Sequence, residues 1–147
     1  MRHNLIVVLL LSVGPLFAKP AYACSCMLPP ASEQMALADV VFLGRAIDQH
    51  QVGKTLQTTF HVTMFWKGDL GQQVTIITND NVNTITSCDL YLGSQIDYLV
   101  YVTKYKGALT TGFCAVKQAF ELAQDMKVLG PGKIPVPSTR PQIKKGP

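Results

Sequence analysis

Two cysteines separated by a single residue, Cys24 and Cys26, stand directly after a stretch with the features of an export signal. Cleavage after Ala23 would make Cys24 the first residue of the exported chain. A cysteine in that position brings a thiol, an α-amine and a backbone carbonyl within a few bonds of one another. The chemistry expected of the segment Cys24-Ser25-Cys26-Met27 therefore depends on where the chain is cut.

Residues 1–23 have the three parts of a secretion signal. Arg2 and His3 supply a positive start, Leu5–Val13 is an apolar run without charge, and Ala21-Tyr22-Ala23 fits the small-x-small cleavage pattern. The apolar run is too short for a permanent membrane span. We expect a cleaved signal peptide. The alternatives are an N-terminal buried helix and a lipoprotein signal, which usually has Leu three residues before the cysteine, where this chain has Ala21.

The composition predicts one small exported domain with crosslinks. All four cysteines follow the signal, and an even number in an exported chain indicates two disulfides, which help a small core. The formal net charge of +4 is mild, and no basic stripe alternates with aromatic residues, so nucleic acid is not an expected partner. Residues 130–147 are rich in Pro, Gly and Lys and are expected to be a disordered tail. We expect a secreted or periplasmic monomer without a membrane span.

Hydrophobic periodicity predicts a mainly β domain over residues 24–129. Ser32 is expected to cap a helix over 33–38, and a second helix is expected over 120–129, ended by Gly130-Pro131. A polar turn region is expected over 49–54. Strands are expected over 40–47, 59–66, 74–78, 98–103 and 108–114. Five short strands with two small flanking helices favour a five-stranded Greek-key barrel of the oligonucleotide/oligosaccharide-binding type. The alternative, an immunoglobulin-like sandwich, needs about seven strands.

The remaining polar residues do not form a catalytic pattern, so an enzyme is not predicted. His50 and His61 have no ligand spacing and are interpreted as solvent-facing, and Trp66 is interpreted as core. The acidic residues show no paired arrangement for acid–base work. A copper(I) site over Cys24-Ser25-Cys26-Met27 is an alternative, since soft sulfur ligands suit that metal, but thiols in an oxidising compartment pair instead.

The chain resembles the N-terminal, netrin-like domain of the tissue inhibitors of metalloproteinases, in a trimmed, bacterial-type form. The resemblance covers Cys24 to about Leu129, and its most specific element is the Cys-x-Cys at the processed terminus with two later single cysteines. The matching segments are Cys24-Ser25-Cys26-Met27-Leu28-Pro29-Pro30, Ala38-Asp39-Val40-Val41-Phe42-Leu43-Gly44, Phe65-Trp66-Lys67-Gly68, Ser87-Cys88, Tyr98-Leu99-Val100-Tyr101 and the strand ending at Cys114.

The resemblance implies a disulfide pairing that the residues alone leave open. A bond between Cys24 and Cys26 is disfavoured because it would close a strained small ring, and the two other pairings both tie the N-terminal segment to the barrel. The family pattern implies Cys24 with Cys88 and Cys26 with Cys114.

The resemblance also implies inhibition of a zinc metalloendopeptidase. The terminal α-amine and the carbonyl of Cys24 would chelate the protease's zinc at the open position that normally holds the attacking water. The chain would need no cofactor of its own. Ser25 would enter the primed-side pocket of the protease. We call the implied contact surface the inhibitory ridge; it comprises Cys24, Ser25, Cys26, Met27, Thr86, Ser87 and Cys88.

Departures from the family, and a second class of function, limit this expectation. The His-Pro pair of animal members is replaced by Pro30-Ala31-Ser32, Asp89 stands where many relatives have Gly, and the loop between the first two strands is short. The third disulfide and the cysteine-rich C-terminal domain are also missing, so a matrix metalloproteinase is not expected as the natural target.

The alternative is a netrin-type module that binds a protein or polysaccharide and uses the cysteines only as structural crosslinks.

Overall fold

β-branched and aromatic residues in alternation build the sheet that organises this chain. The computed structural model describes residues 24–83 and 88–137, so the expected signal peptide and most of the expected tail lie outside the described residues. The elements are α2 (Ala31–Leu37), β1 (Val40–Val52), β2 (Thr55–Lys67), β3 (Gln73–Asn79), β4 (Asp97–Tyr105), β5 (Ala108–Thr110), the 3-10 turn η2 (Phe113–Ala115), β6 (Val116–Lys117) and α3 (Ala119–Leu129).

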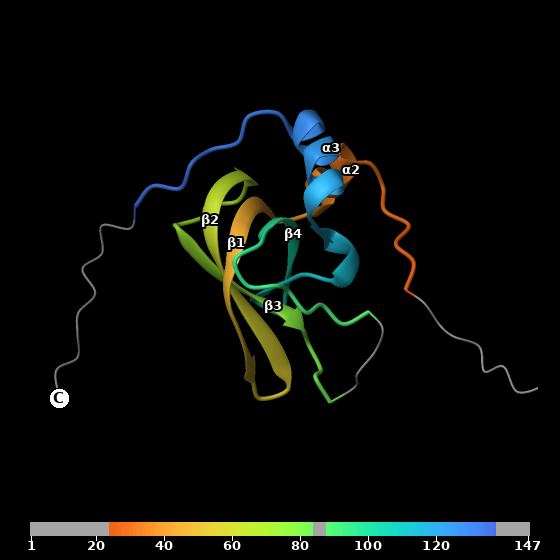
Figure 1. Cartoon of the computed structure of the whole chain (residues 1–147), viewed down its shortest axis with the longest axis vertical. Coiled ribbons are helices and arrows are strands. Elements are labelled where there is room, and N and C mark those ends of the chain that lie inside the picture. Colours follow the sequence, from red (N-terminus) through yellow and green to blue (C-terminus); the bar gives the residue numbers. More distant parts are fainter. Residues whose placement is uncertain (1–23, 84–87, 138–147) are drawn as a thin grey trace, which may run out of the picture.

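Five of the strands form a closed ring. The sheet runs in the order β1-β2-β3-β5-β4-β6, and an additional pairing of β1 with β4 completes the circuit (Figure 1). The narrowest seam joins β3 to β5, where the strands pair in parallel through Ile77 and Thr110. There the backbone N–H of Thr111 donates to the carbonyl of Ile77 at 3.0 Å. The prediction of a mainly β, barrel-like domain with two small helices is confirmed.

The core occupies both faces of β4, whose apolar run is almost continuous. On one face Phe42, Phe60 and Tyr98 meet edge to face, with ring centroids 5.3 and 6.5 Å apart. On the other face Leu99 and Tyr101 are buried in a second cluster, which α2 and α3 cover (Figure 1). A strand buried on both sides is a central strand, as the sequence predicts.

A buried polar cluster fastens α3 to the sheet. The Lys117 ammonium lies 2.6 Å from Asp125 Oδ2, and the Tyr101 hydroxyl donates to the same oxygen at 2.8 Å. Burial, reinforced by the hydrogen bond to Asp125, raises the pKa of Tyr101 well above its ordinary value. The helix is therefore attached to β4 and β6 by a charge pair as well as by apolar packing.

The first hairpin is longer than predicted. β1 continues to Val52, so the turn expected over 49–54 is wrong; the two-residue turn consists of Gly53, with φ +61°, and Lys54. Polar residues can extend the strand because Gln49 turns inward, where its Nε2 donates to Thr58 Oγ1 at 2.7 Å. Hydrogen bonds between polar side chains thus stabilise this end of β1, whereas the other strands bury apolar side chains.

Two boundaries near the cysteines also differ from expectation. α2 begins at Ala31 after Pro30 and has no side-chain cap, so Ser32 lies within the helix rather than capping it. The fifth strand ends at Thr110, and Cys114 lies in η2 instead of in the strand. The predicted end of the last helix is confirmed, because Gly130 adopts φ +70° directly after Leu129.

Candidate functional site

Residues 24–30 form an irregular segment that two disulfides hold against the barrel. Cys24 is bonded to Cys88 and Cys26 to Cys114, with Cα–Cα distances of 5.6 and 5.4 Å. This is the pairing that the family resemblance implies. Cys88 belongs to the loop after β3, and Cys114 to η2, so the segment is tied to two different connections of the sheet.

A third contact fixes the other end of the segment. The side-chain amide of Gln34 donates to the carbonyl of Pro29 at 2.6 Å, and Gln34 is buried within α2. Segments at a chain terminus normally fray. Here the backbone is held at Cys24, Cys26 and Pro29, which leaves little freedom to the residues between them.

The side chains between these anchors point into solvent. Ser25 is exposed, Met27 is 97% exposed, and Leu28 is 40% exposed. Single exposed apolar residues are common on protein surfaces, so the exposure of Met27 alone does not indicate a binding site. The fixed backbone therefore presents a short row of accessible side chains.

The structure brings together part of the predicted inhibitory ridge. Cys24, Ser25, Cys26 and Met27 are continuous, and the first disulfide joins Cys88 to them. Thr86 and Ser87 lie outside the described residues, so their position relative to this segment stays a prediction.

Two aromatic residues beside the ridge were not anticipated. Tyr91 is 63% and Phe113 is 43% exposed. Together with Cys26 and Leu28 they line a hollow of about 300 Å³. The position of Phe113 next to Cys114 was the available signal in the sequence, whereas Tyr91 had none. Large apolar side chains thus flank the second disulfide.

The described residues carry no metal centre of their own. Within 24–83 and 88–137, no three His, Cys, Asp or Glu side chains gather closely enough to hold a metal ion. All four cysteines are in disulfides, so thiolate binding of copper(I) by Cys24 and Cys26 is wrong. His61 is exposed on β2, and His50 lies on the surface 2.7 Å from Asp48, as solvent-facing residues should.

Asp97, a surface carboxylate with a lowered pKa, is part of an ion pair where β1 pairs with β4. Arg45 Nε lies 2.9 Å from Asp97 Oδ1, and its Nη2 donates to Oδ2 at 3.0 Å. The hydrogen bond from Arg45 lowers the pKa of Asp97, and the Asp97 carboxylate raises the pKa of Arg45. Both groups are exposed and pair with each other, so their arrangement indicates a cross-strand contact rather than a catalytic acid.

No family model and no curated protein matches the chain. In the described part, neither helix has the length and apolar character that a bilayer span requires. The two disulfides are the bonds expected of a secreted or extracytoplasmic protein.

Proposed function

We propose that the exported chain inhibits a zinc metalloendopeptidase by chelating its catalytic zinc through the terminal amine and carbonyl of Cys24. The observation that carries the proposal is the pair of disulfides on either side of Ser25. Structural crosslinks could be placed anywhere in the barrel, whereas these two converge on the first three residues that signal cleavage would leave. Cleavage by signal peptidase in an extracytoplasmic compartment is part of the proposal.

The chemistry requires an amine and a carbonyl on one residue. Together they close a five-membered chelate on the metal and displace the water that a catalytic zinc holds at its open position. An α-amine has an ordinary pKa of about 8, so its deprotonation for metal binding is inexpensive at neutral pH. The protease supplies the zinc, and this chain supplies the two donor atoms.

Rigidity of the segment favours tight docking. Binding orders flexible groups, and a segment that is already ordered avoids this loss. The three anchors at Cys24, Cys26 and Pro29 provide such order before the protease arrives. Ser25 is small and exposed, and it would enter the primed-side pocket, while Met27 would contact the rim of the protease cleft.

The first experiment is an intact-mass measurement of the exported protein. The proposal expects a mass for residues 24–147 with two disulfides and no lipid. An acylated Cys24 would exclude chelation, because acylation turns the amine into an amide whose nitrogen lone pair is delocalised into the carbonyl group and does not bind the metal.

The deciding experiment moves the amine by one residue. The exported protein is assayed against a panel of zinc endopeptidases, with a serine protease as the control enzyme. One alanine inserted between Ala23 and Cys24 is expected to abolish inhibition, because the chelating pair is no longer on the anchored residue. The matched control carries one alanine after Pro147 and should inhibit normally. Inhibition that survives the inserted alanine would refute chelation, and absence of inhibition by the parent chain would favour the netrin-type binding module.

A further inference from the structure

The sulfur atoms of this protein differ in their oxidation state. The four cysteines form two disulfides, so no free thiol is left among the described residues. The chain also has five methionines, and four of them follow the expected signal: Met27, Met35, Met64 and Met126. Their thioethers are therefore the sulfur groups of the exported chain that a mild oxidant can oxidise reversibly.

Three of these four methionines are partly covered by the fold. Met35 packs against the core cluster that contains Leu99. Met64 is half-buried beneath the segment after α3, where a β-carbon built on Gly132 would lie 2.8 Å from its sulfur. Met126 is half-buried on α3. Because oxidation of a sulfur depends on its accessibility, packing protects these three thioethers.

Met27 differs from them in exposure and in the way its backbone is held. Its side chain is 97% exposed. The disulfide of Cys26 precedes it directly, and two residues later the carbonyl of Pro29 accepts from the side-chain amide of Gln34. The thioether therefore stays on the surface, and a change in its chemistry disturbs almost no contact within the fold.

A peroxide is the class of oxidant that suits this thioether. A sulfur lone pair attacks one peroxide oxygen, so an S–O bond forms while the O–O bond breaks. The departing hydroxide takes the proton of the new S–OH group and leaves as water. The sulfur loses two electrons and the peroxide gains them, and the product is methionine sulfoxide. A reductase that carries a dithiol reverses the reaction, giving the thioether, water and a disulfide in the reductase.

We propose that reversible oxidation of Met27 by a peroxide lowers the inhibitory activity of the exported chain. The effect on inhibition rests on the proposed function, in which Met27 contacts the rim of the protease cleft. A thioether is apolar and loses little when a partner covers it, whereas the oxygen of a sulfoxide must give up its water. The amine and carbonyl of Cys24 are unchanged, so oxidation weakens docking without removing the chelating pair.

The selectivity of the oxidation is tested without any protease. The disulfide-intact exported protein is treated with limiting hydrogen peroxide, and peptide mapping by mass spectrometry follows each methionine over time. Met27 is expected to react about tenfold faster than Met35, Met64 and Met126 because of its exposure. Thermal melting should give the same midpoint before and after treatment. Equal rates for the four methionines would overturn the proposal.

The effect on inhibition is tested with the same material. Oxidised protein should inhibit a sensitive zinc endopeptidase about tenfold more weakly, and methionine sulfoxide reductases A and B, one for each epimer, should restore inhibition. Peroxide should leave inhibition by Met27→Leu at its own untreated value. Met35→Leu, the matched control, should lose inhibition on treatment as the parent does.

Two outcomes of this assay separate the switch from the proposed function. A parent chain that inhibits equally well with Met27 oxidised would overturn the switch and leave chelation standing. A parent chain that does not inhibit before treatment would overturn the proposed function, and the effect of Met27 on inhibition with it.

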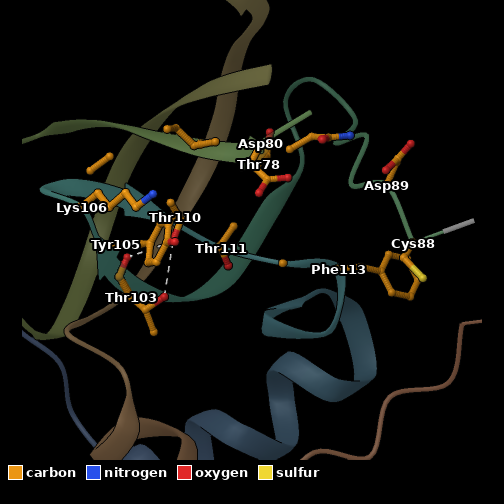
Figure 2. Close-up of a pocket in the computed structure, with 14 residues that line it drawn as sticks. Thr78, Asp80, Cys88, Asp89, Thr103, Tyr105, Lys106, Thr110, Thr111 and Phe113 are labelled. Carbon is orange, nitrogen blue, oxygen red and sulfur yellow. Dashed lines mark hydrogen bonds between the residues drawn. The ribbon is translucent and has the colours of Figure 1, made fainter. Parts of the chain in front are cut away.

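A polar substitution imitates the sulfoxide without an oxidant. Met27→Gln has a polar side chain of similar length and should weaken inhibition about tenfold, as oxidation does. The matched control is Tyr105→Gln, which changes an exposed apolar side chain outside the inhibitory ridge. Figure 2 shows Tyr105 and Lys106 at one end of the groove over the β3–β5 pairing, with Cys88 and Phe113 at the other. Tyr105→Gln should inhibit like the parent, and equal inhibition by both variants would contradict the proposal.

Discussion

At the scale of single residues, Lys117 is the clearest case of a charge whose burial depends on one partner. Its side chain is 9% exposed, and its ammonium contacts Asp125 and lies over the ring of Tyr101 at 5.5 Å. Burial of an unpaired charge is strongly unfavourable, whereas a paired one is tolerated. The stability of the contact between α3 and the sheet therefore depends on the charge of Asp125.

Replacement of that charge alone should destabilise the protein. Asp125→Asn keeps the shape of the side chain but leaves Lys117 without a counter-ion, and we expect the free energy of unfolding to fall by about 3 kcal/mol. Urea denaturation measures the change. Glu121→Gln removes an exposed charge from the same helix and should have almost no effect. The double variant Lys117→Met/Asp125→Leu should recover much of the loss, and a double variant less stable than Asp125→Asn would show that the pair is not the cause.

At the scale of elements, a glycine permits the bend of the first hairpin. The register of β1 against β2 shifts between Leu43 and Gly44, so the strands coil as they enter the ring. A β-carbon built on Gly44 would lie 2.9 Å from the carbonyl oxygen of His61 and 3.0 Å from the ring of Phe42. Both neighbours are in the interior of the sheet and cannot move aside easily.

A side chain at this position should therefore be unfavourable. Gly44→Ala is expected to lower the free energy of unfolding by about 2 kcal/mol, because backbone and a buried ring must shift to relieve the overlap. Gly71→Ala is the control, since a β-carbon there meets nothing within 4 Å and the backbone is not in the left-handed region. Chemical denaturation of both variants tests the idea, and equal stabilities would show that the strands adapt without loss.

The elements also show which parts of the fold the sequence could reveal. Alternation in β2 and the continuous apolar run of β4 come from burial in the core, so their types and approximate positions were predictable. The extension of β1 was not, because Gln49 and Thr58 satisfy each other through a hydrogen bond that only tertiary pairing creates. The sequence also predicts Cys114 at the end of a strand, because no residue near it distinguishes the 3-10 turn η2 from a continued strand.

For the candidate site, the sequence indicated residues but not surroundings. The number of cysteines and their positions after the expected signal predict disulfides, so the anchoring of the N-terminal segment could be predicted from the sequence. Asn79, Tyr105 and Phe113 line one groove over the place where β3 pairs with β5, and their types have no spacing that predicts this groove. A surface that forms where two distant strands pair depends on tertiary structure, so local patterns in the sequence do not predict it.

At the scale of the whole molecule, the two disulfides close long loops and fix the same segment. Their cysteines are separated by 64 and 88 positions in the chain. Loops of this length restrict the unfolded chain strongly, and each bond is expected to contribute about 2–4 kcal/mol to stability. Because one segment carries both bonds, the loss of either affects the inhibitory ridge and the fold together.

Removal of the second disulfide separates these two effects. The double variant Cys26→Ala/Cys114→Ala keeps the amine and carbonyl of Cys24 and its bond to Cys88, while residues 26–28 lose an anchor. We expect a fall of about 2–4 kcal/mol in the free energy of unfolding. We also expect weaker protease inhibition, of about tenfold, measured where the variant is still folded, because docking must then order the segment. Faster dissociation should account for most of the change.

A control of comparable stability, Gly44→Ala, should inhibit like the parent. If both variants inhibit equally well, the second disulfide only stabilises the barrel, and rigidity beyond Cys24 is not needed for inhibition.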